Sequence, residues 1–241
     1  MIDKTRERNI NAFLENSGQN YVDPNLRRFI DSVPSIKSIK DLKDLDRLVF
    51  NYMRHDNNPV LQREKFAKSA SDIFARGTYS GCSDIGILFS SILREKGIPT
   101  VYIESAEASW LDDVRNGKDN GMRGHVFLEL QLGNQSILYD PSWHKVYNGY
   151  DRNNPNLPRG LIAFSKGLNP SDVGVSSIRD ERNSALREIG NVSYTDPNYS
   201  FVDLREQRQR FRFTNLSIFN KTTNLNHKGL SNSYNNAGKS K

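Results

Sequence analysis

Residues able to bind metals or form disulfides are scarce in this chain. Its 241 residues include one cysteine, four histidines, three methionines and two tryptophans. A single cysteine excludes an intrachain disulfide and is typical of a reducing compartment. No cysteines or histidines stand at the spacing of metal ligands, so we expect neither a zinc site nor another cofactor.

Long apolar runs are also missing. No stretch of about 18 apolar residues occurs, so we expect no membrane-spanning helix. The first residues are polar and lack the apolar core of a secretory signal. These features favour a cytoplasmic protein, although secretion after removal of a leader remains open. The sequence does not indicate an oligomeric state.

The net charge is +6, and part of it lies near the C-terminus. Lysines recur in residues 220–241, and arginines alternate with Gln and Phe in residues 205–213. The alternation predicts a strand with one arginine face. Nucleic-acid binding through that face is not favoured, since no recognised motif accompanies the charge.

The only cysteine lies in the most informative stretch, residues 78–103. Cys82 follows a glycine and precedes an apolar helical pattern that a glycine and a proline end near residues 97–99. A thiol at a helix N-terminus meets unpaired backbone N–H groups, which stabilise a thiolate. Cys82 is therefore a candidate nucleophile. Taken alone, a single cysteine is more often a small buried apolar residue than a nucleophile.

Apolar spacing predicts several further elements. We expect helices from residue 24 to about 34, from residue 41, and from residue 59 to Gly77, the last as one continuous helix. Residues 105–123 are predicted to be a long polar loop. A helix is expected over residues 181–189, with strands at 199–204 and 210–218.

A β-hairpin is predicted around the turn Gly133-Asn134. The flanking runs alternate in polarity, and a two-residue turn with Gly first is of type II′. In that register Leu132 faces Gln135, and His125 and Asp140 become diagonal neighbours on one face. Diagonal Cβ atoms about 7 Å apart allow an imidazole–carboxylate hydrogen bond. Such a pair orients the second ring nitrogen toward a nucleophile, and Cys82 is the matching candidate.

These motifs together resemble the transglutaminase-like superfamily. Gly-Cys82-Ser-Asp with its apolar helix resembles the family's cysteine segment, Gly-His125-Val-Phe its histidine strand, and Leu-Tyr-Asp140-Pro its aspartate strand. Residues 164–174 are similar to a segment that follows the aspartate strand in bacterial members. The resemblance covers roughly residues 70–180 and is carried by the order and spacing of the motifs.

The resemblance implies an α+β, papain-like core. Its nucleophile would lie at the N-terminus of a helix packed on an antiparallel sheet that carries His and Asp. Cys82 would attack an amide carbonyl, His125 would move protons and Asp140 would orient His125. The backbone N–H of Cys82 would be the first oxyanion donor; Tyr79 and residues 51–52 are guesses for the second. The chain lacks the tryptophan near the cysteine, the flanking β-domains and the calcium sites of animal cross-linking enzymes.

We expect one domain over residues 1–219. It comprises N-terminal helices (1–77), a catalytic core (78–180) and C-terminal elements (181–219), and a disordered tail follows (220–241). Trp143 is expected to pack beside the triad. The favoured function is a thiol hydrolase that cleaves a peptide or side-chain amide of a protein or peptide substrate. Amine transfer onto glutamine and a non-catalytic binding module with a retained triad remain alternatives.

Overall fold

The computed structural model describes residues 2–3, 10–16, 18–118 and 120–205. The helices are α1 (Pro24–Ser32), α2 (Ile39–Tyr52), α3 (Pro59–Arg63), α4 (Ala70–Arg76), α5 (Cys82–Glu95), α6 (Ala108–Arg115) and α7 (Ile178–Ile189). The strands are β1 (Ile2–Asp3), β2 (Arg54–His55), β3 (Thr78–Tyr79), β4 (Thr100–Glu107), β5 (Gly124–Leu132), β6 (Gln135–Asp140), β7 (Lys145–Asn148), β8 (Asn156–Leu157), β9 (Leu161–Gly167) and β10 (Ser200–Asp203). The 3-10 helices are η1 (Ile10–Leu14), η2 (Gly18–Asn20), η3 (Pro158–Gly160) and η4 (Ser171–Val173).

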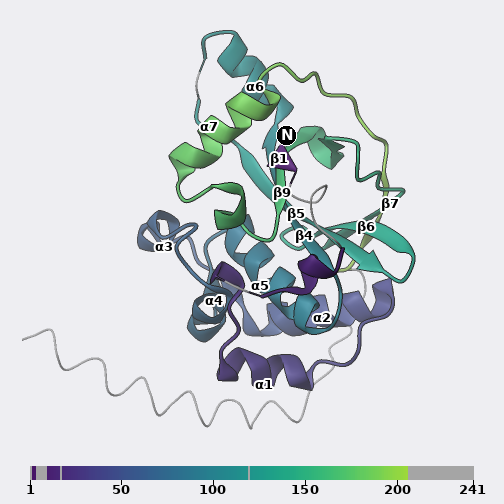
Figure 1. Cartoon of the computed structure of the whole chain (residues 1–241). Helices are drawn as coiled ribbons and strands as arrows, with labels where there is room; N and C mark the ends of the chain where they lie inside the picture. Colours follow the sequence, from purple (N-terminus) through teal and green to yellow (C-terminus); the bar gives the residue numbers. More distant parts are fainter. Residues whose placement is uncertain (1, 4–9, 17, 119, 206–241) are drawn as a thin grey trace, which may run out of the picture. The chain divides into compact units, whose positions relative to one another are not determined.

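One mixed sheet organises the described part of the chain. Its strand order is β1-β9-β4-β5-β6-β7-β10, and β8 pairs with β9 outside this path. Apart from the parallel pair β1–β9, all pairs in this sheet are antiparallel. β2 and β3 form a small parallel pair. The α+β class and the papain-like arrangement of a helix on an antiparallel sheet are therefore confirmed (Figure 1).

Helix α5 is the most deeply buried helix of this core. Every residue from Ser83 to Arg94 is buried. Gly86 faces the sheet, and a Cβ there would come within 2.7 Å of Val126 and 3.0 Å of Tyr102. A glycine at this position thus lets the helix approach β4 and β5 closely.

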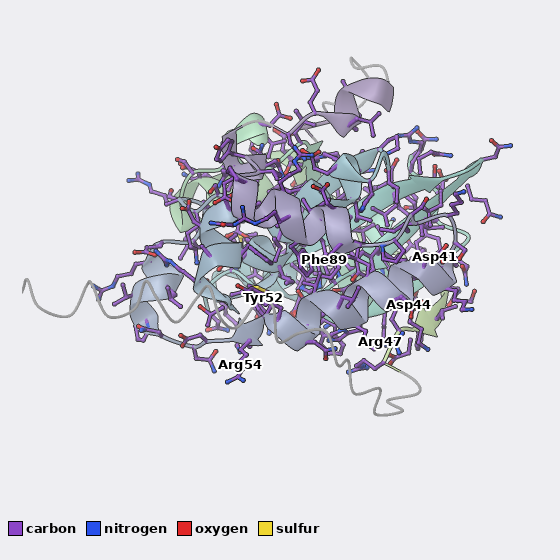
Figure 2. All side chains as sticks on the ribbon, turned by 90° about the horizontal axis from the view of Figure 1, so that it is seen from below. Asp41, Asp44, Arg47, Tyr52, Arg54 and Phe89 are labelled. Atoms are coloured by element: carbon purple, nitrogen blue, oxygen red, sulfur yellow. The ribbon has the colours of Figure 1, made fainter. Side chains whose placement is uncertain are left out.

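Helix α2 packs beside α5 against the same face of the sheet, where its Asp46 accepts a hydrogen bond of 2.6 Å from the hydroxyl of Tyr139 in β6. Its Phe50 ring lies 5.7 Å from the ring of Phe89 in α5. Figure 2 shows the polar residues Asp41, Asp44 and Arg47 along α2. The buried apolar residues of α2 belong to the same core cluster as α5 and one face of the sheet. Such a one-sided apolar stripe is what orients an amphipathic helix.

The predicted continuous helix from residue 59 to Gly77 is wrong. The structure has two helices, α3 and α4, separated at residues 64–69. Phe66 has a left-handed φ of 70° and is buried with Val173 and Val175. Ser69 and Asp72 then form a capping box that begins α4. Local capping and the burial of Phe66 together override the continuous apolar spacing.

The predicted loop at residues 105–123 is also wrong in part. Strand β4 extends to Glu107, and helix α6 follows at once. Trp110 and Leu111 of α6 are buried in a cluster with residues of β9 and α7, including Phe164 and Ile189. This short helix is stabilised by tertiary packing, which its polar sequence did not reveal.

The hairpin register is confirmed. Leu132 pairs with Gln135 and Leu128 with Tyr139. Gly133 has a φ of 57°, as the first position of a type II′ turn requires. The predicted helices at residues 24–34 and 181–189 and the strand at 199–204 are present as α1, α7 and β10.

Several predictions fall on residues that the structure does not describe. The strand at 210–218, the arginine face at 205–213, the domain boundary at 219 and the tail at 220–241 all involve residues after 205 and stay predictions. Within the described ranges, no helix has the length and apolar character needed to cross a membrane.

A buried ion pair holds the segment that leads into α5. Lys68 Nζ lies 2.5 Å from Asp84 Oδ2 and 3.2 Å from Ser80 Oγ. The backbone N–H of Ser80 also donates to Asp84 Oδ2 at 2.8 Å. The side chains of Lys68 and Asp84 are only 6% and 1% exposed. This network ties the approach to Cys82 to the first turn of its helix.

We predict that Lys68→Met destabilises the protein by about 3–5 kcal/mol, because it leaves the buried carboxylate of Asp84 without its charged partner. Arg76→Met is the matched control, since the Arg76–Glu64 pair is 41% and 38% exposed. An exposed pair contributes roughly 1 kcal/mol or less. Urea unfolding of both variants measures the difference. Equal effects would contradict a structural role for the Lys68–Asp84 pair.

Candidate active site

Cys82 is the first residue of α5. Gly81 precedes it in extended backbone and provides no side-chain cap. The backbone N–H groups of the first helical turn have no partner within the helix and act as donors toward an anion. Asp84 points back to Ser80, away from these donors, through the network described above. Cys82 itself is partly exposed.

His125 is the second residue of β5 and is held from two sides. In the sheet it pairs with Ser105 of β4, whose hydroxyl donates to the His125 carbonyl at 2.8 Å. The ring of Phe127 meets the imidazole edge-on, with 5.0 Å between ring centroids. The side chain of His125 is 12% exposed, so packing orders the imidazole while part of it remains accessible to a ligand.

Asp140 is the last residue of β6 and is fully buried. Its Oδ2 lies 2.8 Å from Nε2 of His125, so the hydrogen bond expected from the hairpin register is present. Its Oδ1 accepts the backbone N–H of Trp143 at 3.1 Å. Because Nε2 is occupied by Asp140, Nδ1 is the ring nitrogen that remains for Cys82.

The thiol of Cys82 and the imidazole of His125 lie close enough for each to shift the pKa of the other through hydrogen bonding and charge. Burial raises the pKa of Cys82, but this hydrogen bond and the positive charges of His125 and Lys65 bring that pKa below its ordinary value. Burial lowers the pKa of His125, whereas the hydrogen bonds to Asp140 and Cys82 raise that pKa to about 10. Because the pKa of the Cys82 thiol is lowered and the pKa of the His125 imidazole is raised, a thiolate–imidazolium pair is favoured at neutral pH.

Trp143 lies beside Asp140, as expected, but it is not enclosed. Its side chain is 42% exposed. The guanidinium of Arg159 stacks 3.4 Å from the centre of its ring, and Nη1 of Arg159 lies 3.5 Å from Asp140 Oδ2. Arg159 thus places a positive charge at the outer side of the aspartate.

Three charged residues near Cys82 were missed by sequence reasoning. Lys65 Nζ forms an ion pair of 2.9 Å with Glu181 Oε2, and its charge reaches Cys82. Glu104 is fully buried, and neither of its carboxyl oxygens has a close hydrogen-bond partner. Burial and the charge of Glu181 raise the pKa of Glu104 well above its usual range, which favours its neutral form.

Only one of these residues left a signal in the sequence. Glu104 is a charged residue in the interior of the buried strand β4, which is unusual for a buried strand. Lys65 follows α3, and Glu181 belongs to the polar first turn of α7. Nothing in their local sequence separates them from solvated surface charges.

A cavity of about 160 Å³ opens beside the nucleophile. It is lined by Lys65 and by residues 80–84. The two guesses for a second oxyanion donor have other partners: Tyr79 packs on Phe50, and Tyr52 stacks on Phe74. A donor role for either stays a prediction. Among the described residues, no group of three or more His, Cys, Asp or Glu is placed to hold a metal ion.

We predict rapid alkylation of Cys82 by iodoacetamide at pH 6. A thiolate at this pH requires the lowered thiol pKa that His125 and Lys65 produce; an ordinary thiol of pKa about 8.5 is less than about 1% ionised there. In His125→Ala the rate should fall at least about tenfold, since a more basic thiolate is somewhat more nucleophilic and offsets part of the loss. Intact mass against time measures both rates. Equally slow labelling of both proteins would contradict an activated cysteine.

Comparisons with known proteins add little beyond this geometry. No protein-family model and no curated protein matches the chain. One similar solved structure is a candidate cysteine protease from Cytophaga hutchinsonii, with a TM-score of 0.49 and 18% identity over 70% of this chain and 50% of that one. The chain therefore spans about half the length of that protein. A likeness at this level is too weak to transfer the activity named for that protein.

Proposed function

We propose that this protein is a cysteine-nucleophile acyl-transfer enzyme that acts on amide bonds through a thioester. In its simplest form it is a hydrolase of a peptide bond or a side-chain amide in a protein or peptide. The observation that carries the proposal is the placement of Cys82 beside the imidazole of His125, whose Nε2 is hydrogen-bonded to buried Asp140. The sequence resemblance to the transglutaminase-like superfamily supports the same chemistry.

In the first step the thiolate of Cys82 attacks the amide carbonyl carbon, and a carbon–sulfur bond forms. The carbonyl oxygen becomes an oxyanion, for which the free N–H groups at the start of α5 are the nearest donors on the helix. The imidazolium of His125 then gives its proton to the amide nitrogen. The carbon–nitrogen bond breaks, the amine leaves and a thioester remains.

In the second step neutral His125 takes a proton from water, and the resulting hydroxide equivalent attacks the thioester. The carbon–sulfur bond breaks, the acid leaves and the thiolate–imidazolium pair is restored. Asp140 supports both steps because its carboxylate keeps the ring in one orientation and stabilises the imidazolium. A primary amine in place of water would give amine transfer by the same route. The thiol must be reduced, which fits the cytoplasmic location expected from the sequence.

The proposal is tested by incubating the protein with a peptide library prepared from a cell lysate and a primary amine such as monodansylcadaverine. The modified peptides are then identified by mass spectrometry. New peptide termini would indicate peptide hydrolysis, conversion of Gln or Asn to the acid would indicate deamidation, and incorporated amine would indicate transfer. We expect hydrolysis in one of the first two forms. Cys82→Ala should abolish it, and Asp140→Asn should reduce it at least about a hundredfold.

The matched control is Asp112→Asn, which removes one exposed carboxylate of α6 and should leave the activity unchanged. The absence of all three products, in a protein whose Cys82 is alkylated rapidly, would overturn the enzyme assignment and favour a binding module. Amine incorporation without hydrolysis would make the protein a transferase instead.

A further inference from the structure

The cavity beside Cys82 presents one net charge, and that charge is positive. Its lining residues include Cys82, whose thiolate is balanced by the imidazolium of His125, and two other charged residues, Lys65 and Asp84. The carboxylate of Asp84 is 1% exposed and is bound by Lys68 and Ser80, so it is neutralised behind the cavity wall. The charge that remains for a ligand is the ammonium of Lys65.

Lys65 is held in place by a carboxylate buried more deeply than itself. In the Lys65–Glu181 pair the two side chains are 21% and 5% exposed, so the ammonium is the end that reaches the open space. This bond occupies one of the three N–H donors of the ammonium. The remaining donors can bind a second acceptor without breaking the ion pair.

Glu181 in turn is pressed against the strand that carries His125. A Cβ at Gly124 would lie 2.7 Å from Glu181 Oε1, so the residue before His125 leaves the space that the carboxylate fills. One carboxylate from α7 therefore fixes Lys65 relative to the start of β5. A surface lysine that served only solubility would not be anchored in this way.

The surrounding acids do not cancel the positive charge at the cavity. Glu181 and Glu104 do not line it. Burial and the charge of Glu181 raise the pKa of Glu104 and so favour its neutral form, and the carboxylate that directly opposes Lys65 is its ion-pair partner Glu181. The ammonium of Lys65 would repel a cationic group of the substrate and attract an anionic group at short range.

We propose that Lys65 is a specificity-determining residue that binds a carboxylate of the substrate close to the amide attacked by Cys82. The substrate class is then an acidic peptide or a peptide with a free carboxylate next to the reacting amide. This inference rests on the proposed function, because it assigns a role within the same site.

Two alkylating reagents of nearly equal size test the charge preference directly. Iodoacetate carries a carboxylate and iodoacetamide does not; in both reactions the Cys82 sulfur forms a bond to carbon and iodide leaves. Both require the thiolate, so the ratio of their rate constants does not depend on the thiolate fraction. Relative to wild type, Lys65→Met should lower the iodoacetate-to-iodoacetamide ratio about tenfold, as expected for one partly screened charge.

Glu181→Gln is expected to act in the opposite direction. It removes the negative charge that partly offsets Lys65, so the ratio should rise. Lys118→Met is the matched control, because Lys118 is exposed after α6 and its loss changes the net charge equally. It should leave the ratio unchanged. If Lys65→Met fails to fold, Lys65→Met/Glu181→Gln removes both charges of the pair and should still lower the ratio, by less than tenfold, because the loss of Glu181 offsets part of the effect.

The outcomes separate this inference from the proposed function. Rapid, His125-dependent alkylation with a ratio that Lys65→Met does not alter would overturn the role of Lys65 alone. A fall in the ratio for Glu181→Gln would also contradict it. Slow alkylation by both reagents, unchanged in His125→Ala, would overturn the proposed function itself.

Discussion

The burial of α5 against the sheet is the constraint on which the site depends. A helix whose residues 83–94 are all buried can shift neither along nor around its axis without opening the core. Its first residue is therefore held at one position relative to β4 and β5. Gly86 sets the distance between helix and sheet, and the Lys68–Asp84 pair fixes the direction from which the chain enters. The position of Cys82 is therefore set by contacts that other residues of α5 and its neighbours make.

The sheet supplies the other half of the arrangement. His125 and Asp140 lie on neighbouring strands joined by a two-residue turn, so their relation depends on a short piece of chain. The imidazole is then positioned by Asp140, Phe127 and the backbone contact from Ser105. Charge follows from these contacts. The buried aspartate favours the imidazolium, and the imidazolium favours the thiolate. The ion pair we infer is a consequence of burial and hydrogen bonding together.

Sequence reasoning succeeded where a local rule was sufficient. The turn Gly133-Asn134 set the hairpin register, and the register placed His125 beside Asp140. The apolar spacing after Cys82 placed it at a helix start. Sequence reasoning failed where contacts between distant segments decided the local structure. Phe66 interrupts a helical pattern because it packs on Val173 and Val175, and residues 108–115 form a helix because Trp110 finds a buried site against β9 and α7.

The chain by itself therefore determined the helix that begins at Cys82, the hairpin and the candidate triad, since each depends on periodicity, turn chemistry and short-range spacing. Only the tertiary structure decided the electrostatics around that triad. Lys65, Glu104 and Glu181 come from three separate segments, and their local sequences carry no common pattern. The raised pKa values of Lys65 and Glu104 and the access of Lys65 to the cavity depend on burial and on distances across the core. Those quantities exist only once the segments have packed together.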